Sequence, residues 1–506
     1  MNRSPQKFGS LGIVVGVCAL FQISGCSDLW MSSLVTDKRN CAIAPAVCGD
    51  FEECDYLTET CKPLPPPSCP LISLESISPA VGTRTGGTKV TITGSGFQGD
   101  MRVEIDGTPL ENVVVEASSQ LSGTLGASMA SCGPSAVTLI SSCFERVSKE
   151  RAFSYSLDPL QFDDLPQTLP SPTGTSVQQL LIDDVNADGD PDILGVESGS
   201  FRTFLSDGVG SFTTSAPLAL GSSLFQAARG DITGDKALDL VITDQTNPRL
   251  WFLQNNGKGV FAPQSIAMPE PQRGVVVSDL TGDGKSDAVV VGKSGTLYLL
   301  TGNANGLTGP DTVANGLPMG SQFAALADVN SDGQPELLVA GGTTQLVEVW
   351  QKSGAQAFTR LSQKSVPGVA SSVLAVDVNR DGKLDLVVAL SDQTNLAVLA
   401  GQGAGGFGAA VTVPSGTTPR WLDAIDTNCD GMSDIVASSA TENKLALLFG
   451  TQSGTLATPR ILDLSAHQNG VVPSLAVADV NFDGLADLVV GSTQSPAYLL
   501  ISNVSP

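Results

Sequence analysis

Short apolar runs separated by turns rich in glycine and aspartate fill residues 158–506 of the chain. Runs such as Leu384–Val388 and Asp487–Val490 are rich in leucine and valine and too short for core helices, so they indicate buried β-strands. Others, such as Trp251–Leu253 and Tyr298–Leu300, are followed by a glycine-rich turn and another apolar residue. The pattern predicts four short strands in each unit of about 49 residues, which is the size of one β-propeller blade.

The same nine-residue loop recurs in every unit. It begins with aspartate, carries oxygen-bearing side chains at positions 1, 3, 5 and 9, and has glycine at position 6 in all copies but one. An apolar run follows each copy, so each loop is expected to join two strands. The copies, called loops 1 to 7 below, are residues 184–192, 231–239, 279–287, 328–336, 377–385, 426–434 and 479–487, and their first residues are 47 to 53 positions apart.

The loops predict bound calcium, because oxygen side chains at these positions converge on one point and hard oxygen ligands suit Ca²⁺. An EF-hand is excluded, since its acidic position 12 falls here on glycine, alanine, valine or isoleucine. We expect up to seven calcium ions, with loop 2 doubtful: Lys236 replaces the glycine and brings a cation, and Thr233 replaces asparagine. The predicted ligands are Asp184, Asn186, Asp188, Asp190, Asp192, Asp231, Thr233, Asp235, Asp239, Asp279, Thr281, Asp283, Asp287, Asp328, Asn330, Asp332, Glu336, Asp377, Asn379, Asp381, Asp385, Asp426, Asn428, Asp430, Asp434, Asp479, Asn481, Asp483 and Asp487.

Seven loops predict seven blades, but the last unit stops after Tyr498–Leu500 without a fourth strand. A candidate lies at the other end of the domain, where Phe162 and Leu165–Leu169 precede the first full unit. We therefore expect this N-terminal segment to complete the last blade and close the ring, which removes exposed strand edges.

These repeats resemble the FG-GAP/VCBS family of calcium-bearing β-propellers, which includes the ring of integrin α chains, over about residues 158–506. The resemblance implies a recognition module, although some calcium-loop propellers belong to polysaccharide lyases or other carbohydrate-active proteins. Arg229-Gly230-Asp231 spells the tripeptide that some integrins bind. Because Asp231 is already the first ligand of loop 2, we interpret that match as coincidence.

Alternating apolar and polar residues between glycine turns also mark residues 70–156, for example at Val90–Phe97 and Val103–Gly107. The order of the Gly86-Gly87-Thr88 and Thr93–Phe97 blocks resembles the IPT/TIG domain, an immunoglobulin-like β-sandwich that is usually a spacer or partner-binding module. The expected fold class is therefore all-β: a seven-bladed β-propeller preceded by this β-sandwich and by a small disulfide-rich segment.

The N-terminus has the features of an export signal: Arg3 and Lys7, then the apolar run Leu11–Ile23, too short to span a bilayer. Ile23-Ser24-Gly25-Cys26 resembles the lipobox of bacterial lipoproteins, in which the cysteine is lipidated and becomes the new N-terminus. An ordinary signal peptide is the alternative. We expect residues 1–25 to be a lipoprotein signal peptide, Cys26 the lipid anchor and residues 26–40 a tether. Ser27, by the same resemblance, favours the bacterial outer membrane, with the protein facing the periplasm or the outside.

Eight cysteines remain in a chain that is expected to reach an oxidising compartment, so disulfides are predicted. Residues 41–69 hold a cysteine-rich stub with almost no apolar core, followed by a proline-rich spacer, and the stub loosely resembles EGF-like modules. A zinc site is the competing interpretation. The disulfide candidates are Cys41 with Cys54, Cys48 with Cys61, and Cys132 with Cys143, which leaves Cys69 and Cys429 without an evident partner.

Composition excludes some classes of function. The 51 Asp and Glu residues against 27 Lys and Arg give a net charge of −24, which opposes a nucleic-acid partner. His467 is the only histidine, so most histidine-dependent catalysis is excluded, and we expect no enzymatic activity and no catalytic residues.

The sequence thus favours a membrane-anchored, calcium-binding module for adhesion to a protein or polysaccharide ligand. The alternatives are a carbohydrate-active, lyase-like enzyme or its accessory domain, and a structural spacer. With aromatics at only 5%, a protein ligand is mildly favoured over a glycan.

Overall fold

The computed structural model describes residues 52–55 and 60–63 and most of residues 71–503. Within the latter range, the residues outside the description are 85, 100, 127–133, 142–145, 157–160, 163–166, 171–175, 222, 319, 322–323, 355, 452, 467–470 and 495. Every regular element in the described part is a β-strand, in agreement with the predicted all-β class. None of the described residues forms a helix with the length and hydrophobicity required to cross a membrane.

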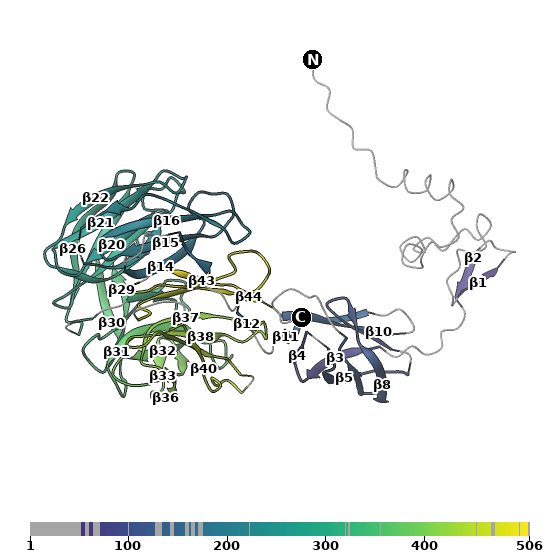
Figure 1. Cartoon of the computed structure of the whole chain (residues 1–506). Helices are drawn as coiled ribbons and strands as arrows, with labels where there is room; N and C mark the ends of the chain where they lie inside the picture. The colour runs from purple at the N-terminus through teal and green to yellow at the C-terminus, as the bar shows by residue number, and fades with distance from the viewer. Residues whose placement is uncertain are drawn as a thin grey trace, which may run out of the picture.

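The first described element is a two-stranded hairpin of β1 (Glu52–Asp55) and β2 (Thr60–Pro63), whose register places Cys54 opposite Cys61. A β-sandwich follows (Figure 1). Its sheets have the strand orders β4-β11-β10-β6-β7 and β3-β5-β9-β8. Their bounds are β3 (Ser73–Ser78), β4 (Val81–Thr83), β5 (Lys89–Ser95), β6 (Arg102–Ile105), β7 (Thr108–Pro109), β8 (Glu111–Ala117), β9 (Gln120–Thr124), β10 (Pro134–Ile140) and β11 (Arg146–Ser156).

The sandwich core follows from the alternation in its strands. In β5, every second residue is buried, so that Val90 and Ile92 face inward while the flanking lysine and serine are exposed. They join Ile105, Leu121 and other residues of the facing sheets in one hydrophobic cluster.

The rest of the described chain forms seven antiparallel sheets, or blades, each with a path of four strands, together with two short strand pairs. Blades 1 to 3 consist of β14 (Val177–Asp183), β15 (Asp192–Glu197), β16 (Ser200–Ser206) and β17 (Phe212–Thr214), with β18 (Leu218–Ala219) beside β16; β19 (Leu224–Gly230), β20 (Asp239–Asp244), β21 (Arg249–Asn255) and β22 (Phe261–Ala267); and β23 (Gln272–Ser278), β24 (Asp287–Gly292), β25 (Thr296–Asn303) and β26 (Gly306–Asn315).

Blades 4 to 7 repeat the order. They consist of β27 (Ala324–Ala327), β28 (Glu336–Ala340), β29 (Leu346–Gly354) and β30 (Ala357–Ser365); β31 (Ala370–Val376), β32 (Asp385–Leu390), β33 (Asn395–Leu399) and β36 (Val411–Pro414), with the pair β34 (Gly401–Gly403) and β35 (Gly406–Phe407); β37 (Pro419–Ile425), β38 (Asp434–Ser439), β39 (Lys444–Leu448) and β40 (Arg460–Asp463); and β41 (Leu475–Ala478), β42 (Asp487–Val490), β43 (Tyr498–Leu500) and β13 (Gln167–Thr168).

The first strands of the blades follow one another in a closed circle, because each contacts the next and β41 contacts β14. The ring is sealed by the N-terminal segment. β13 pairs antiparallel with β43, and β12 (Gln161–Phe162) pairs with β44 (Ser502–Asn503). Both pairings confirm the closure that the sequence predicts, and Figure 1 shows β12 and β44 side by side at the edge of the ring nearest the sandwich.

Burial explains why the sequence of the second strand of each blade, which follows the loop, is a continuous apolar run. The second strand of a blade, such as β32, is buried along its whole length, because the neighbouring blades cover both of its faces. The fourth strand, such as β22, is largely exposed. Near the axis, Gln226 of β19 donates from Nε2 to the carbonyl oxygen of Ala324 in blade 4 (3.0 Å), so a side-chain amide supplements the apolar contacts between blades.

Candidate metal centres

All seven loops lie at the same edge of the ring, because each joins the end of a first strand to the start of a second strand. The register is the same in every blade: the last residue of the first strand pairs with loop position 9, as in Asp183 with Asp192 and Val376 with Asp385. The fold therefore places the seven loops in the same register on one face of the propeller.

The carboxylate at position 1 accepts hydrogen bonds from its own loop. In loop 3, Asp279 Oδ1 accepts from the backbone N–H groups of Gly282 (2.7 Å) and Asp283 (3.2 Å), and its Oδ2 accepts from Gly284 (2.9 Å). The same pattern holds for Asp231. These bonds fold the loop tightly around the position 1 carboxylate.

Positions 3 and 5 are brought to that carboxylate. In loop 1, the backbone N–H of Asp188 donates to Asn186 Oδ1 (2.9 Å) and to Asp184 Oδ1 (3.3 Å), and Asn186 Nδ2 donates to Asp188 Oδ2 (2.7 Å). Asp190, the additional acidic residue of this loop, is placed apart from them: its carboxylate lies against Gly208, where an added Cβ would be 2.7 Å from Oδ1.

The acidic side chain at position 9 is buried and connects the loop to the third strand of its blade. Asp385 is 1% exposed. Its Oδ2 accepts from the backbone N–H groups of Val378 (3.0 Å) and Asn379 (3.3 Å), and its Oδ1 accepts from Gly401 (2.7 Å), the first residue of β34. Equivalent bonds from the loop and from the end of the third strand reach Asp192, Asp239, Asp287, Asp434 and Asp487. Position 9 is thus a structural link as well as a predicted ligand.

Burial makes several of the position 9 carboxyls costly to ionise. It raises the pKa of Asp192 and Asp487 to about 6 and that of Asp434 to about 7, against the ordinary value of 3.8. The pKa values of Asp239, Glu336 and Asp385 are also raised, again chiefly by burial. A divalent cation beside such groups favours their charged form.

The described residues contain no group of three or more His, Cys, Asp or Glu side chains already converged on one metal position. The donor set nevertheless fits calcium, because it consists of carboxylate, amide and hydroxyl oxygens. Two oxygens support this fit: Asp479 Oδ1 at position 1 of loop 7 and Thr233 Oγ1 at position 3 of loop 2 are both buried and have no hydrogen-bond partner. Positions 1, 3, 5 and 9 would hold the ion.

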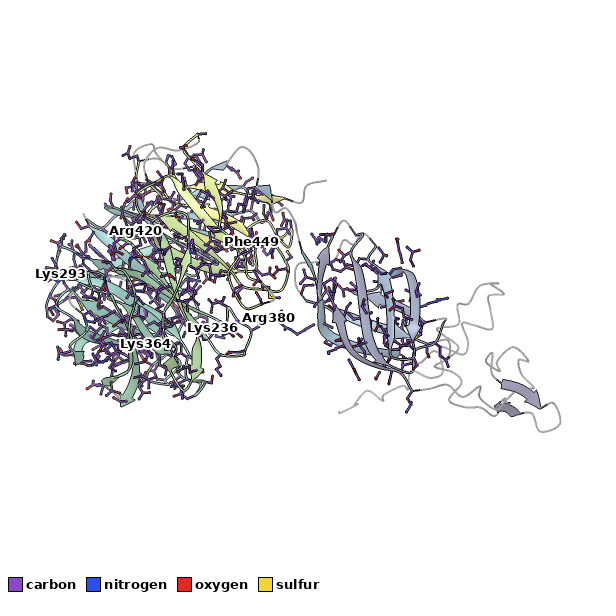
Figure 2. All side chains as sticks on the ribbon, turned by 90° about the horizontal axis from the view of Figure 1, so that it is seen from below. Lys236, Lys293, Lys364, Arg380, Arg420 and Phe449 are labelled. Atoms are coloured by element: carbon purple, nitrogen blue, oxygen red, sulfur yellow. The ribbon has the colours of Figure 1, made fainter. Side chains whose placement is uncertain are left out.

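Loop 2 has the strained backbone that its sequence predicts. Lys236 adopts φ 73°, and the glycines at position 6 of the other loops have φ between 78° and 93°. Lys236 is exposed (Figure 2), so its side chain does not help to bury the loop.

Replacing Lys236 with glycine is expected to raise the free energy of unfolding by about 0.5–1 kcal/mol in chelator, because a left-handed lysine costs more than a glycine does. It should also add about one bound calcium ion per chain. Thermal unfolding and elemental analysis check both effects. The matched control is Gly284→Lys in loop 3, where an added Cβ meets no atom within 4 Å, so the substitution introduces backbone strain and charge without a clash at Cβ. If the two variants do not change stability in opposite directions, the residue at position 6 is not the reason why loop 2 differs from the other loops.

Two features of this face were not predicted. The residue at position 4 has positive φ in every loop, including Arg380 (57°), Cys429 (61°) and Phe482 (57°). Glycine signals this conformation only at Gly234 and Gly282. The second feature is a charged group among the first strands: Arg229 Nε forms an ion pair with Asp183 Oδ2, and the charge of Arg229 also acts on Asp423. Arg229 is therefore engaged within the ring.

Asp423 predicts a pH-dependent stability. Burial raises its pKa to about 6, although its carboxylate accepts from the N–H groups of Ala424 and Val477 and faces the charge of Arg229. Because the folded pKa exceeds the unfolded one, the stability that the neutral acid contributes is present below pH 4 and is lost as the pH rises through 6. The Asp423→Asn variant has no such loss. The difference between its free energy of unfolding and that of the wild type should therefore increase by about 2–3 kcal/mol in favour of the variant between pH 4 and pH 7.

Chemical denaturation at several pH values measures that difference. The amide nitrogen of asparagine cannot accept one of the two hydrogen bonds, but this cost is independent of pH and does not enter the trend. Asp463→Asn, at an exposed aspartate, is the control and should show no such gain. A difference between Asp423→Asn and wild type that stays constant with pH would contradict the prediction.

Several predicted residues lie outside the described part of the chain: Cys26, Cys41, Cys48, Cys69, Cys132, Cys143 and His467. Of Cys54 and Cys61, only the backbone is described. The sequence left the pairing of Cys429 open, and in the structure Cys429 is disulfide-bonded.

Comparison with known families gives two matches. The profile of the FG-GAP-like repeat matches residues 184–242, 231–290, 279–339, 328–388, 377–437 and 427–490, which together span more than half of the chain. The profile of the IPT/TIG domain matches residues 73–154. A search of curated protein sequences finds no match.

Similar solved structures include three proteins. BBS1N, in complex with ARL6DN, has 9% identity and a TM-score of 0.47, covering 69% of this chain and 97% of that one. An auxiliary nutrient binding protein from Bacteroides ovatus has 11% identity and a TM-score of 0.42, covering 85% and 98%. An Agrocybe aegerita lectin that recognises non-reducing terminal N-acetylglucosamine has 14% identity and a TM-score of 0.42, covering 78% and 100%.

Proposed function

The chain belongs to the family of proteins built from FG-GAP-like repeats, and from this premise we propose that it is a calcium-braced adhesion module, anchored by lipid to the bacterial outer membrane. The coarser description, a β-propeller binding or adhesion module with an IPT/TIG domain, follows from the family matches. The observation that carries the proposal is the set of seven equivalent oxygen-rich loops on one face of the ring.

Calcium, when bound, supplies positive charge that offsets the repulsion and burial of the loop carboxylates. The protein's own residues shape the loops and attach them to the blades. The position 1 carboxylate folds the loop, position 9 ties the loop to the blade, and the second strands provide the core. A scaffold braced in this way holds surface loops in fixed positions, which reduces the ordering cost of binding a ligand.

The proposed ligand is a protein or a polysaccharide outside the cell or in the periplasm, and no catalytic role is assigned. Binding is supported by the presence of a single histidine, His467, in the whole chain and by the use of the buried acids in loop hydrogen bonds. A carbohydrate-active enzyme remains the second candidate only through the resemblance of the repeats.

Binding is tested with beads that carry the purified protein, presented to separate purified polysaccharides and surface proteins in calcium and in EGTA. We expect saturable binding to at least one of them, lost in EGTA and restored by calcium. Depolymerisation of a polysaccharide during the same incubation would favour the enzyme instead. Binding that is equal in EGTA, or no binding at all, would contradict calcium-dependent adhesion.

Anchoring is tested separately, by labelling bacterial cells with a palmitate analogue. The wild-type protein should incorporate the label and fractionate with the outer membrane. Cys26→Ser should lose both, whereas Cys18→Ser, within the predicted signal peptide, should retain both. A labelled Cys26→Ser protein would place the lipid elsewhere.

A further inference from the structure

Loop 6 is enclosed, unlike the other loops of the ring. None of its residues is exposed, whereas each of the other six loops has at least two exposed residues. The contrast is sharpest at position 4. Cys429 is 1% exposed there, and its counterparts in the other loops are all exposed, including Phe482 at 57%. Something outside the repeat pattern must therefore cover this loop.

The cover comes from the β-sandwich. A Cβ added to Gly431 of loop 6 would lie 2.6 Å from Oγ of Ser154, near the end of β11. The Ser154 side chain is only 6% exposed. From the neighbouring loop, Arg380 Nη1 approaches Met432 Sδ to 3.5 Å. Figure 2 shows Arg380 on the side of the propeller that faces the sandwich.

The disulfide of Cys429 lies within this contact, two residues before Gly431. The backbone register of the sandwich identifies which cysteine can reach it: Ser154 pairs directly with Pro134, the first residue of β10. Cys132 stands two residues before Pro134, a reach of about 7 Å for an extended chain. We infer that Cys429 is bonded to Cys132, so that the disulfide fastens the sandwich over loop 6 of the propeller.

The described strand ends nearest in sequence to Cys143 and Cys69 are not the ends beside Ser154. Cys143 lies between Ile140 and Arg146, which pair at the opposite end of the β10–β11 hairpin from Pro134 and Ser154. Since β10 has seven residues, the two ends are about 20 Å apart. Cys69 precedes β3, whose opposite end leads through Pro79 into β4, the neighbour of Ser154. The pair predicted from the sequence, Cys132 with Cys143, would have to span the hairpin lengthwise.

Peptide mapping of the unreduced, alkylated full chain tests the inference directly. Trypsin leaves Cys132 and Cys143 together in residues 103–146 and Cys429 in residues 421–444, so chymotrypsin, which cleaves after Leu139, is needed to separate the first two. The expected result is a linked pair that contains Cys132 and Cys429 and disappears on reduction. A link from Cys429 to any other cysteine, or from Cys132 to Cys143, would overturn the assignment.

Hydrogen exchange tests the fastening itself. In Cys132→Ser, Cys429→Ser and the double variant, amides of residues 426–434 should exchange at least tenfold faster than in the wild type, to the same extent in all three. The equivalent loop 5, residues 377–385, is the internal control and should change little. Cys143→Ser is the matched variant and should leave loop 6 protected.

The peptide map tests the pairing even if one of the variants folds poorly, because it is made on the wild type. Loop 6 amides that stay protected in Cys132→Ser while they become labile in Cys429→Ser would overturn the proposed pair. Equal lability in Cys143→Ser would do so as well.

Discussion

Transferring the purified protein from calcium to EGTA is expected to lower its midpoint of thermal unfolding by more than about 10 °C. A site held at about 100 times its Kd stabilises the folded state by about 2.7 kcal/mol, and six such sites contribute on the order of 15 kcal/mol. The physical reason is that loops such as 1, 6 and 7 bury carboxyls that are costly to ionise without a neighbouring cation. Calorimetry in the two buffers, with elemental analysis of the dialysed protein, measures the shift and the stoichiometry.

Magnesium is the control for nonspecific charge neutralisation. It prefers a rigid octahedral shell and retains its water, so it should restore only part of the lost stability. Five to seven calcium ions per chain together with a large shift would agree with the proposal. No bound calcium and an unchanged midpoint would mean that the loops are hydrogen-bonded turns only, and the proposed ligands would then have no metal to hold.

The sequence was sufficient for features that repeat. A loop that recurs every 47 to 53 residues fixes the number and phase of the blades, because each copy must join the same two strands. It also predicted the closing strand, since the last unit offers three strands and a candidate fourth strand precedes loop 1. Lys236 could be identified as strained because position 6 is glycine in every other copy.

Features that depend on contacts across the fold could not be predicted. The bond from Gly401 to Asp385 depends on where the third strand ends, which the loop pattern does not specify. The burial of Asp423 depends on the blades that surround it. Cys429 occupies a position that is exposed in the other loops, and nothing in its local sequence indicates that the sandwich covers it.

The dual role of position 9 leads to the second large effect, a loss of stability that does not require calcium. Asp385→Ala removes the acceptor of three backbone N–H groups, which are buried at Val378 and Gly401 and half-buried at Asn379. Each unsatisfied buried donor costs about 1–3 kcal/mol, so the variant should lose about 3–5 kcal/mol of unfolding free energy, even in EGTA. Chemical denaturation in chelator measures this loss.

Asp381, at position 5 of the same loop, is the matched control, because its side chain is 40% exposed and it accepts one backbone hydrogen bond, from Lys383. In EGTA, Asp381→Ala should cost about 1 kcal/mol or less, since water can replace the lost acceptor. In calcium, both variants should lose the additional stability that loop 5 gains from its ion, so the gap between them persists while both fall further below wild type. Equal stability of the two variants in EGTA would show that position 9 acts only through the metal, whereas the hydrogen bonds of Asp385 require it to brace the blade on its own.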